Sequence, residues 1–285
     1  MTTPQPTVNR RQLGAELRRL RLAKGPLIED VAAHLQTSQT RVSRMETGKG
    51  RVVIKAEEIG ALCELYGVTD ERQIRLLTSM LSDSKHPGWW DQFREVLPSG
   101  LDVLCGLETD ALAERAWEPL LVHGLLQTPE YAQAILQAWP STRLHDIADL
   151  VKVRTERQAL LTRTDRAPLE LWAILDEAVI RRPVGAAGVM RAQLHHLAEM
   201  AELPNVTLQI APEAKGAHPG LGGAFALLEF DSEPPMVYVD SPAGNLYLDK
   251  KHDVRRFTTT FDLLRAMALD PDDSLVRLRT AAKEK

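Results

Sequence analysis

Apolar residues recur at helical spacing through the first 81 residues. Leu13, Leu17 and Leu20 fall on one face of a helix predicted over residues 9–24, and Gly25-Pro26 ends that run. The segments that follow keep the same three- or four-residue spacing, so the pattern predicts a compact all-α unit. Its five predicted helices are residues 9–24, two short segments within 27–48, one around 59–65 and one over 71–81.

The two short segments within residues 27–48 have the spacing of a helix-turn-helix. Their apolar positions let both helices share one core, and the small Ala32 allows a close crossing. Ser38 is placed to cap the second helix, because its hydroxyl can accept a hydrogen bond from a backbone amide of the first turn. Gly48 is placed to end it. The apolar positions are Val31, Leu35, Val42 and Met45.

The second short helix leaves a polar face outside this core. In a helix-turn-helix such a face enters the major groove, so we expect double-stranded DNA as the leading partner. The N-terminus of the helix also favours a phosphate group. Arg41 lies at the edge of the face. The predicted DNA-binding residues are Ser38, Gln39, Thr40, Arg41, Ser43, Arg44 and Lys49.

These residues resemble the Xre, or lambda-repressor-like, family of DNA-binding domains. The resemblance is carried by Arg21 in the first helix, Ala32 in the second, and Ser-Arg-Met-Glu-Thr-Gly at residues 43–48 of the third. It implies a structural ion pair between Arg21 and Glu46. The second helix departs from the family pattern, because it begins with Leu27-Ile28 where the family usually has threonine, often with glutamine, which cap the helix and contact phosphate.

The charge distribution favours the same partner. Residues 1–51 contain ten basic and four acidic residues, a net charge of +6, whereas the whole chain carries −4 and the remainder therefore −10. Neutralising phosphates with basic side chains releases counterions, and that release drives association with DNA. The acidic remainder is expected to orient the basic end toward DNA.

Size and composition indicate two globular domains. The chain has 285 residues, of which 44% are hydrophobic and 26% charged. No apolar run reaches membrane-spanning length and no signal-peptide pattern occurs, so we expect a cytoplasmic protein without a membrane partner. Cys63 and Cys105 are too few for a disulfide framework or a cysteine-rich metal site. We expect reduced thiols and no cofactor.

A polar stretch with turn-forming residues, 82–88, is the predicted linker between a first domain at 1–81 and a second at 89–285. The second domain alternates helical patterns with short runs rich in branched and aromatic residues. We predict an α+β fold with a mostly antiparallel sheet backed by helices. Its predicted strands are 114–122, 169–175, 206–210, 224–230, 236–239 and 245–248, and its predicted helices are 128–138, 144–161, 189–203, 251–268 and 272–282.

Long segments of the second domain resemble the C-terminal domain of WhiJ-like actinobacterial regulators. In that family an Xre-type domain precedes a domain of unassigned function, so the resemblance implies a transcriptional regulator. Members are often described as antitoxin-like, because they are commonly encoded beside a small partner protein. His123 stands where the family frequently has proline. The segments are residues 88–100, 118–136, 175–185, 190–212 and 216–225.

Residues with catalytic chemistry occur in the second domain without a catalytic pattern. Asp176-Glu177, Arg181-Arg182, His123 and His218 offer acid, base and anion-binding groups. Adjacent carboxylates on a strand point to opposite faces, so this pair is not expected to reach one substrate atom. The glycines at 220–223 precede a strand, whereas a phosphate loop joins a strand to a helix. We expect no enzymatic activity.

Polar residues at strand ends and loop junctions are candidates for a ligand pocket, because pockets with a few polar groups tend to form there. The alternative is an apolar surface for dimerisation or for a small partner protein. A deep cavity indicates the first and a flat apolar patch the second. The candidate pocket residues are Trp117, Glu118, Gln127, Asp176, Arg181, His218 and Tyr238.

These patterns together predict a sequence-specific DNA-binding transcriptional regulator that binds an inverted-repeat operator as a homodimer. Its C-terminal domain is expected to sense a small-molecule effector or a small co-encoded protein. The alternative is an antitoxin-like interaction protein whose main role is to bind that small protein.

Overall fold

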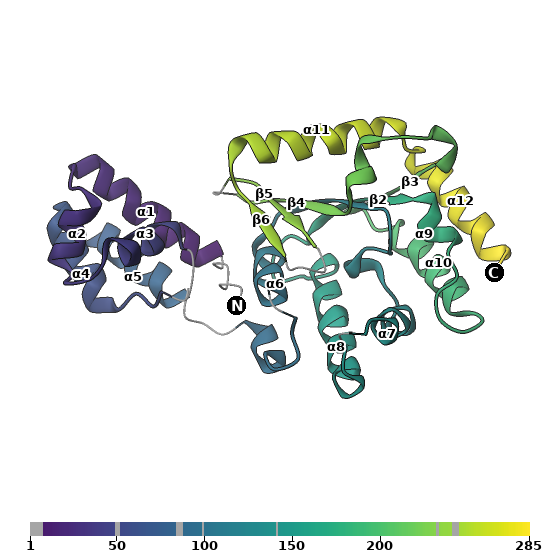
Figure 1. Ribbon diagram of the computed structural model, residues 1–285, viewed down its shortest axis with the longest axis horizontal. Helices are drawn as coiled ribbons and strands as arrows, with labels where there is room; N and C mark the ends of the chain where they lie inside the picture. Colours follow the sequence, from purple (N-terminus) through teal and green to yellow (C-terminus); the bar gives the residue numbers. More distant parts are fainter. Residues whose placement is uncertain are drawn as a thin grey trace. The chain divides into compact units, whose positions relative to one another are not determined.

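The chain forms two compact units. One consists of residues 1–92 and 99–107, and the other of 93–98 and 108–285. Figure 1 shows helices alone in the region of α1 to α5 and a sheet with helices in the second unit. The structure is a computed structural model, and it describes residues 8–48, 52–83, 88–98, 100–140, 142–231, 234–240 and 245–285. Of the predicted linker, residues 84–87 lie outside the described residues.

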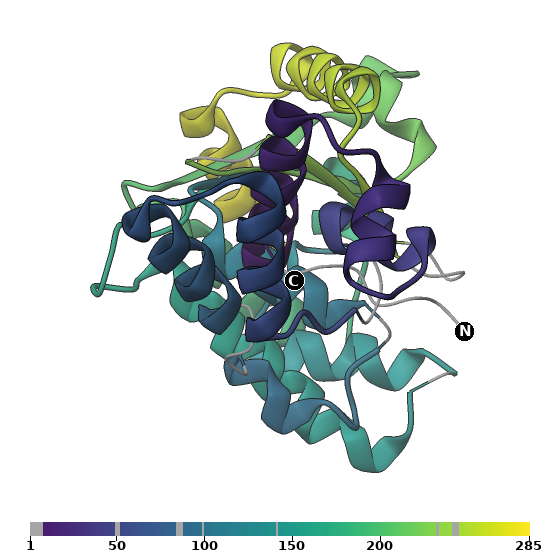
Figure 2. The ribbon, with the colours of Figure 1, turned by 90° about the vertical axis from the view of Figure 1, so that its left-hand side faces the viewer.

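The first unit contains the five predicted helices: α1 (Val8–Lys24), α2 (Ile28–His34), α3 (Gln39–Thr47), α4 (Ala56–Tyr66) and α5 (Glu71–Asp83). Helix α1 packs against α3 and α5, and α2 packs against α3 (Figure 2). The apolar stripes that predicted these helices meet in one core. Its buried residues include Leu13, Leu17, Leu20, Val31, Val42, Met45, Ile59 and Leu62.

Local caps set the limits of α2 and α3. Ser38 caps α3 as predicted, since its Oγ accepts a hydrogen bond from the Arg41 amide at 3.2 Å. Gly48 ends α3 in the left-handed conformation, with φ of 62°. At the start of α2 the Leu27 amide donates to Asp30 Oδ2 at 2.7 Å. Asp30 therefore supplies a capping bond at a helix start that has no threonine.

Helices α1 and α3 touch through their backbones at Gly14. A Cβ on Gly14 would lie 2.5 Å from the Met45 carbonyl oxygen and 2.8 Å from that of Glu46. Real Cβ atoms do not approach backbone oxygens so closely, so this crossing requires glycine. The hydrophobic pattern of the sequence carried no sign of this contact.

The second unit is built on a mixed six-stranded sheet in the order β3-β2-β1-β4-β5-β6. The pairs β1–β2 and β2–β3 are parallel, and the other three pairs are antiparallel. The predicted α+β fold class is therefore confirmed. The strands are β1 (Ala113–Glu118), β2 (Glu170–Asp176), β3 (Val206–Ala211), β4 (Phe225–Glu229), β5 (Met236–Val239) and β6 (Leu246–Leu248).

Helices cover both faces of this sheet (Figure 1). One face packs on α11 (Lys251–Met267) through a core that includes Trp117, Phe225, Phe261 and Leu264. Helices α7 and α8 lie across the opposite face. The other helices of the second unit are α7 (Pro129–Ala138), α8 (Ile147–Gln158), α9 (Glu177–Arg181), α10 (Val189–Met200) and α12 (Pro271–Lys283). Helix α6 (Leu101–Asp110) belongs to the first unit up to Leu107 and to the second from Glu108.

Several elements differ from the sequence prediction. Helices α6 and α9 were not predicted, and β1 ends at Glu118, four residues before the predicted strand end. The helix predicted over residues 144–161 is α8 with a short 3-10 helix at each end. Helix α9 begins directly after β2 because Asp176 Oδ1 accepts from the Ala178 amide at 2.9 Å. None of the described helices is long and apolar enough to span a bilayer.

Candidate DNA-binding surface and buried polar cluster

The outer face of α3 presents most of the predicted DNA-binding side chains to solvent. Val42 and Met45 fill the core on its inner face. The recognition surface, as we call this outer face, therefore has the polarity that major-groove contact requires. Lys49 lies outside the described residues. The exposed residues of the recognition surface are Ser38, Gln39, Thr40, Ser43 and Arg44.

Arg41, at the edge of the recognition surface, is held by contacts within the first unit. Its guanidinium donates to the two carboxylate oxygens of Glu58 at 2.6 and 3.1 Å and to the Val53 carbonyl at 2.9 Å. The hydrogen bonds from Arg41 lower the pKa of Glu58. Arg41 therefore ties α3 to α4 and to the segment before it, a role that the sequence analysis did not assign.

Arg21 and Glu46 form a buried ion pair between α1 and α3. Arg21 donates to the two carboxylate oxygens of Glu46 from Nε at 2.6 Å and from Nη2 at 2.9 Å, and Nη1 reaches the Pro26 carbonyl at 3.2 Å. The side chains are 9% and 5% exposed. This is the geometry that the family resemblance implied, and it fixes α3 against α1.

A polar cluster lies between the sheet and α8 in the second unit. Side chains on a strand alternate between faces, so Glu114 and Glu118 of β1 share one face of the sheet. Arg154 and Arg157 are three residues apart on α8 and so share one side of that helix. We use the name polar cluster for these four residues together with Glu108 of α6, His123, Gln127, Tyr131 and Tyr238.

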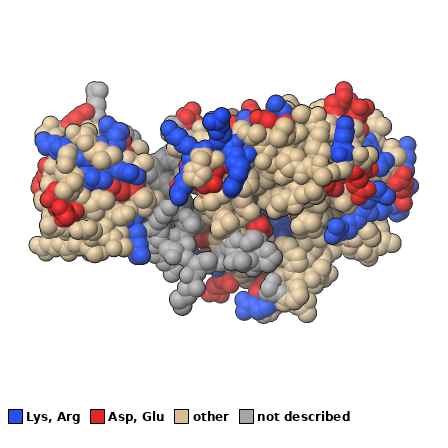
Figure 3. Space-filling model, turned by 45° about the horizontal axis from the view of Figure 1, so that its top comes forward, with Lys and Arg blue, Asp and Glu red and all other residues tan. Residues whose placement is uncertain are grey.

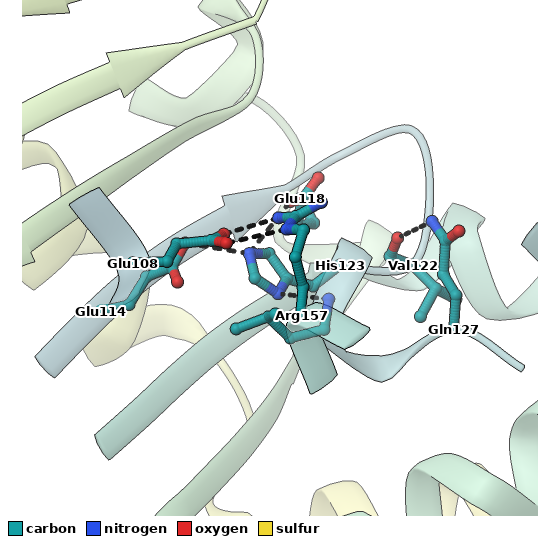
Figure 4. Close-up of polar contacts among 8 residues, drawn as sticks. Glu108, Glu114, Glu118, Val122, His123, Gln127 and Arg157 are labelled. Atoms are coloured by element: carbon teal, nitrogen blue, oxygen red, sulfur yellow. Dashed lines mark hydrogen bonds and ion pairs between the residues drawn. The ribbon is translucent and has the colours of Figure 1, made fainter. Parts of the chain in front are cut away.

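The inner part of the polar cluster is fully paired apart from one oxygen (Figure 4). Arg157 donates to Glu108 from Nε at 2.7 Å and from Nη2 at 2.5 Å. His123 Nε2 lies 3.1 Å from Glu114 Oε1, and its Nδ1 accepts from the Leu125 amide at 3.3 Å. Burial by itself lowers the pKa of His123. The nearby carboxylates, above all that of Glu114, raise it by more, so the pKa lies above its ordinary value. The second oxygen of Glu114 is buried without a hydrogen-bond partner.

The outer part of the polar cluster carries two charges without a close counter-ion. Glu118 is 20% exposed, and its nearest cationic atom is His123 Nε2 at 3.9 Å. Burial raises the pKa of Glu118 to about 7. Arg154 donates a short hydrogen bond to Gln127 Oε1. Burial lowers the pKa of Arg154 to about 10, and no carboxylate of the described residues lies within ion-pair distance of it.

The candidate pocket residues do not meet at one place, because the sheet separates them. Glu118 and Tyr238 lie on the α8 side of the sheet. Tyr238 pairs with Ala226, which pairs with Ala116, and Ala116 shares its face with Glu118. Trp117 and His218 lie on the α11 side, with ring centroids 5.2 Å apart.

Trp117 is completely buried, and its indole nitrogen donates to the Gly220 carbonyl at 2.8 Å. Asp176 lies 3.6 Å from His218 Nε2. Arg181 is exposed and pairs with Glu213 at 2.6 Å.

The adjacent carboxylates Asp176 and Glu177 have structural partners. The argument from strand alternation does not apply to this pair, since Asp176 ends β2 and caps α9, and Glu177 begins that helix. Glu177 accepts from Arg277 Nε at 2.9 Å and from the Glu213 amide at 3.1 Å. Among the described residues, no group of three His, Cys, Asp or Glu side chains is placed to hold a metal ion.

Of the charged members of the polar cluster, the sequence analysis selected Glu118 and His123 and missed Glu108, Glu114, Arg154 and Arg157. Glu108 stands four residues after Leu104 and seven after Leu101, in the helical stripe of α6 where an apolar residue is expected. A charged residue in such a stripe signals a buried ion pair, and Glu108 is 0% exposed. The pattern gave no indication that its partner was Arg157.

The second unit is not acidic everywhere on its surface. Lys and Arg side chains gather around the first turns of α11 (Figure 3). Lys250, Lys251, Arg255 and Arg256 are exposed there. Of these, Arg256 has an ion pair, with Asp253 at 3.4 Å. The charge of −10 outside residues 1–51 is therefore a net value over a mixed surface.

Two parts of the chain match described families. Residues 12–76 match a helix-turn-helix domain. Residues 101–280 match a family described as a domain of unknown function (DUF5753). No curated protein matches the chain, and no solved structure does.

Proposed function

Since the chain belongs to the DUF5753 family and carries a helix-turn-helix domain, we propose that it is a sequence-specific DNA-binding transcriptional regulator. The observation that supports this most directly is the recognition surface of α3. Five polar side chains stand exposed there on a helix anchored by two ion pairs, Arg21–Glu46 and Arg41–Glu58. Such rigidity matters, because base readout requires side chains held in register with the groove.

The regulator is proposed to act as a symmetric homodimer joined mainly through the second unit. One recognition helix contacts too few bases for high specificity, whereas a twofold dimer places a second helix about 34 Å away, one DNA turn on. Its operator is then an inverted repeat. The first unit is the less suitable contact, because two basic domains repel one another without DNA.

The second unit is proposed to receive the signal that alters DNA binding. This role is supported by its polar cluster, which holds charged groups that the fold does not pair. Functional sites retain such groups because a ligand completes them.

Selection of duplexes from a random library with the full chain tests the DNA-binding role. The expected product is an inverted repeat that binds far more tightly than a scrambled duplex at the same salt concentration. Equal affinity for selected and scrambled duplexes contradicts the proposal.

A further inference from the structure

The outer part of the polar cluster lies at the carboxyl end of β1, because Glu118 is the last residue of that strand. The connection after β1 leads to β2 on one side of β1, whereas β4 enters on the other side. Strand order therefore reverses at β1. In parallel sheets the crevice beyond the carboxyl ends at such a reversal is the usual ligand position, and here the antiparallel β4 begins at that end of β1. Tyr238 shares the face of Glu118, because it pairs with Ala226, which pairs with Ala116, two residues before the end of β1.

Among the described residues, two opposite charges in this outer part have no hydrogen-bonded counter-ion, and the nearby Asp240 carboxylate raises the pKa of both. Arg154 uses a single hydrogen bond, to an uncharged amide, although a guanidinium has five donor hydrogens. Glu118 has only a distant contact with a histidine nitrogen, and that nitrogen already bonds Glu114 at 3.1 Å. Buried charges are normally paired, since an unpaired one costs several kcal/mol by order of magnitude. Among the described residues the fold therefore leaves the Arg154 guanidinium without an ion pair and makes ionisation of the Glu118 carboxyl costly.

The two side chains contact the same turn after β1. Glu118 lies 3.9 Å from His123 Nε2, and Arg154 donates to Gln127 Oε1, near the two ends of this turn. Tyr131 accepts a hydrogen bond from the Val122 amide at 3.2 Å, and Gln127 donates to the Val122 carbonyl at 2.7 Å. The turn after β1 is thus held rigidly beside both charges.

Solvent reaches this place although it is deep in the unit. Glu118 keeps 20% of its side-chain surface accessible, and Tyr238 and Arg154 are half-buried. By contrast, Glu108 and Glu114 of the inner part are 0% and 1% exposed. A small molecule can therefore reach the outer charges but not the inner pairs.

We propose that Glu118 and Arg154 bind a small zwitterion of the amino-acid type, with its carboxylate on Arg154 and its ammonium on Glu118. The Tyr238 hydroxyl, which has no hydrogen-bond partner among the described residues, lies beside this site and supplies a further polar contact. The proposal rests on the signal-receiving role proposed above and names the chemistry of the signal. A ligand with one charge leaves the other buried charge unpaired and binds more weakly.

Thermal shift and calorimetric titration of the full chain test this site without DNA. The probes are the twenty L-amino acids, with acetate and ethylammonium as singly charged controls. At least one amino acid is expected to raise the melting temperature, and the singly charged probes are not. Arg154→Gln and Glu118→Gln should each weaken binding of that amino acid about tenfold or more. Lys152→Gln and Glu156→Gln, on the exposed side of α8, should leave it unchanged.

A second measurement separates a binding role from a structural one. If Arg154 serves a ligand, Arg154→Gln removes an unpaired charge, and the ligand-free variant should melt at the same temperature as the parent or higher. A lower melting temperature overturns the proposal, and so does the absence of any amino-acid response. Failure of DNA binding leaves both results intact, because neither uses a duplex. Duplex titration with and without the bound amino acid then tests the signal role by itself.

Discussion

Two arginines of α3, three residues apart, illustrate how the fold assigns different roles to one residue type. Arg41 is fixed by three hydrogen bonds to Glu58 and Val53. Arg44 is exposed on the recognition surface. The guanidinium of Arg44 is therefore available for bidentate contact with a guanine, the commonest specific contact in the major groove.

Replacing Arg44 by alanine should weaken binding of the selected operator by about 1–3 kcal/mol and leave the fold intact. Fluorescence anisotropy on cognate and scrambled duplexes measures this. Arg75→Ala, an exposed arginine of α5 that is 67% accessible, is the matched control and should have little effect. Equal losses on both duplexes reassign Arg44 to phosphate contact.

Glu118 should make the stability of the second unit depend on pH. Its pKa of about 7 in the folded chain exceeds the ordinary value of 4.5, so the folded state holds the proton more tightly than the unfolded state. Stability should then fall as pH rises from 4.5 to 7, by at most about 1.4 kcal/mol per unit.

Urea unfolding at several pH values, followed for the parent and Glu118→Gln, measures this contribution. The glutamine variant should lose less stability between pH 5 and 7 than the parent does. Glu156→Gln, exposed on α8, controls for removal of a carboxylate and should behave as the parent. Parallel pH profiles for the parent and Glu118→Gln refute the prediction.

At the scale of elements, the position of α3 is set by its contacts with α1. Gly14 allows the two backbones to touch, and the Arg21–Glu46 pair also joins α1 to α3. Recognition therefore depends on residues that never meet DNA.

Gly14→Ala should lower the stability of the first unit by about 1–3 kcal/mol, because the methyl group pushes against backbone oxygens that cannot yield. Gly60→Ala is the control, since a Cβ at Gly60 in α4 meets nothing within 4 Å. That variant should gain about 0.5–1 kcal/mol from the better helix former. Thermal unfolding of both variants decides, and a neutral Gly14→Ala contradicts the close crossing.

Glu46→Ala should lower the free energy of unfolding of the same unit by about 3–5 kcal/mol, because it leaves the Arg21 guanidinium buried without its partner. Glu64→Ala, an exposed glutamate of α4, should change it by less than about 0.5 kcal/mol. Melting curves of the full chain suffice, and an unchanged curve for Glu46→Ala refutes the structural role of the pair.

At the scale of the whole molecule, assembly decides specificity. Light scattering should show a dimer for the full chain at micromolar concentration and a monomer for residues 1–83, which end with α5. The reason is that the basic first unit repels a second copy and leaves the contact to the second unit. A monomeric full chain, or a dimeric fragment, removes the basis for an inverted-repeat operator.

The sequence by itself determined the helical first unit, because its signals are local. Apolar spacing, the Ser38 cap and the Gly48 stop act within one or two turns of chain, and each was predicted where the structure has it. The α+β class of the second unit followed from the same kind of signal. Arg21 and Glu46 were paired through a family resemblance, which records a contact that spacing does not reveal.

Only the tertiary structure decided which charges meet. Glu108 and Arg157 are 49 residues apart, and they pair because the fold brings the end of α6 beside α8. The candidate pocket residues Trp117 and Glu118 are neighbours in sequence, yet the pleat sends them to opposite faces of the sheet. The physical reason is that local preferences act between near neighbours along the chain. Strand order and register act between distant segments, and they alone set which polar groups share a buried space.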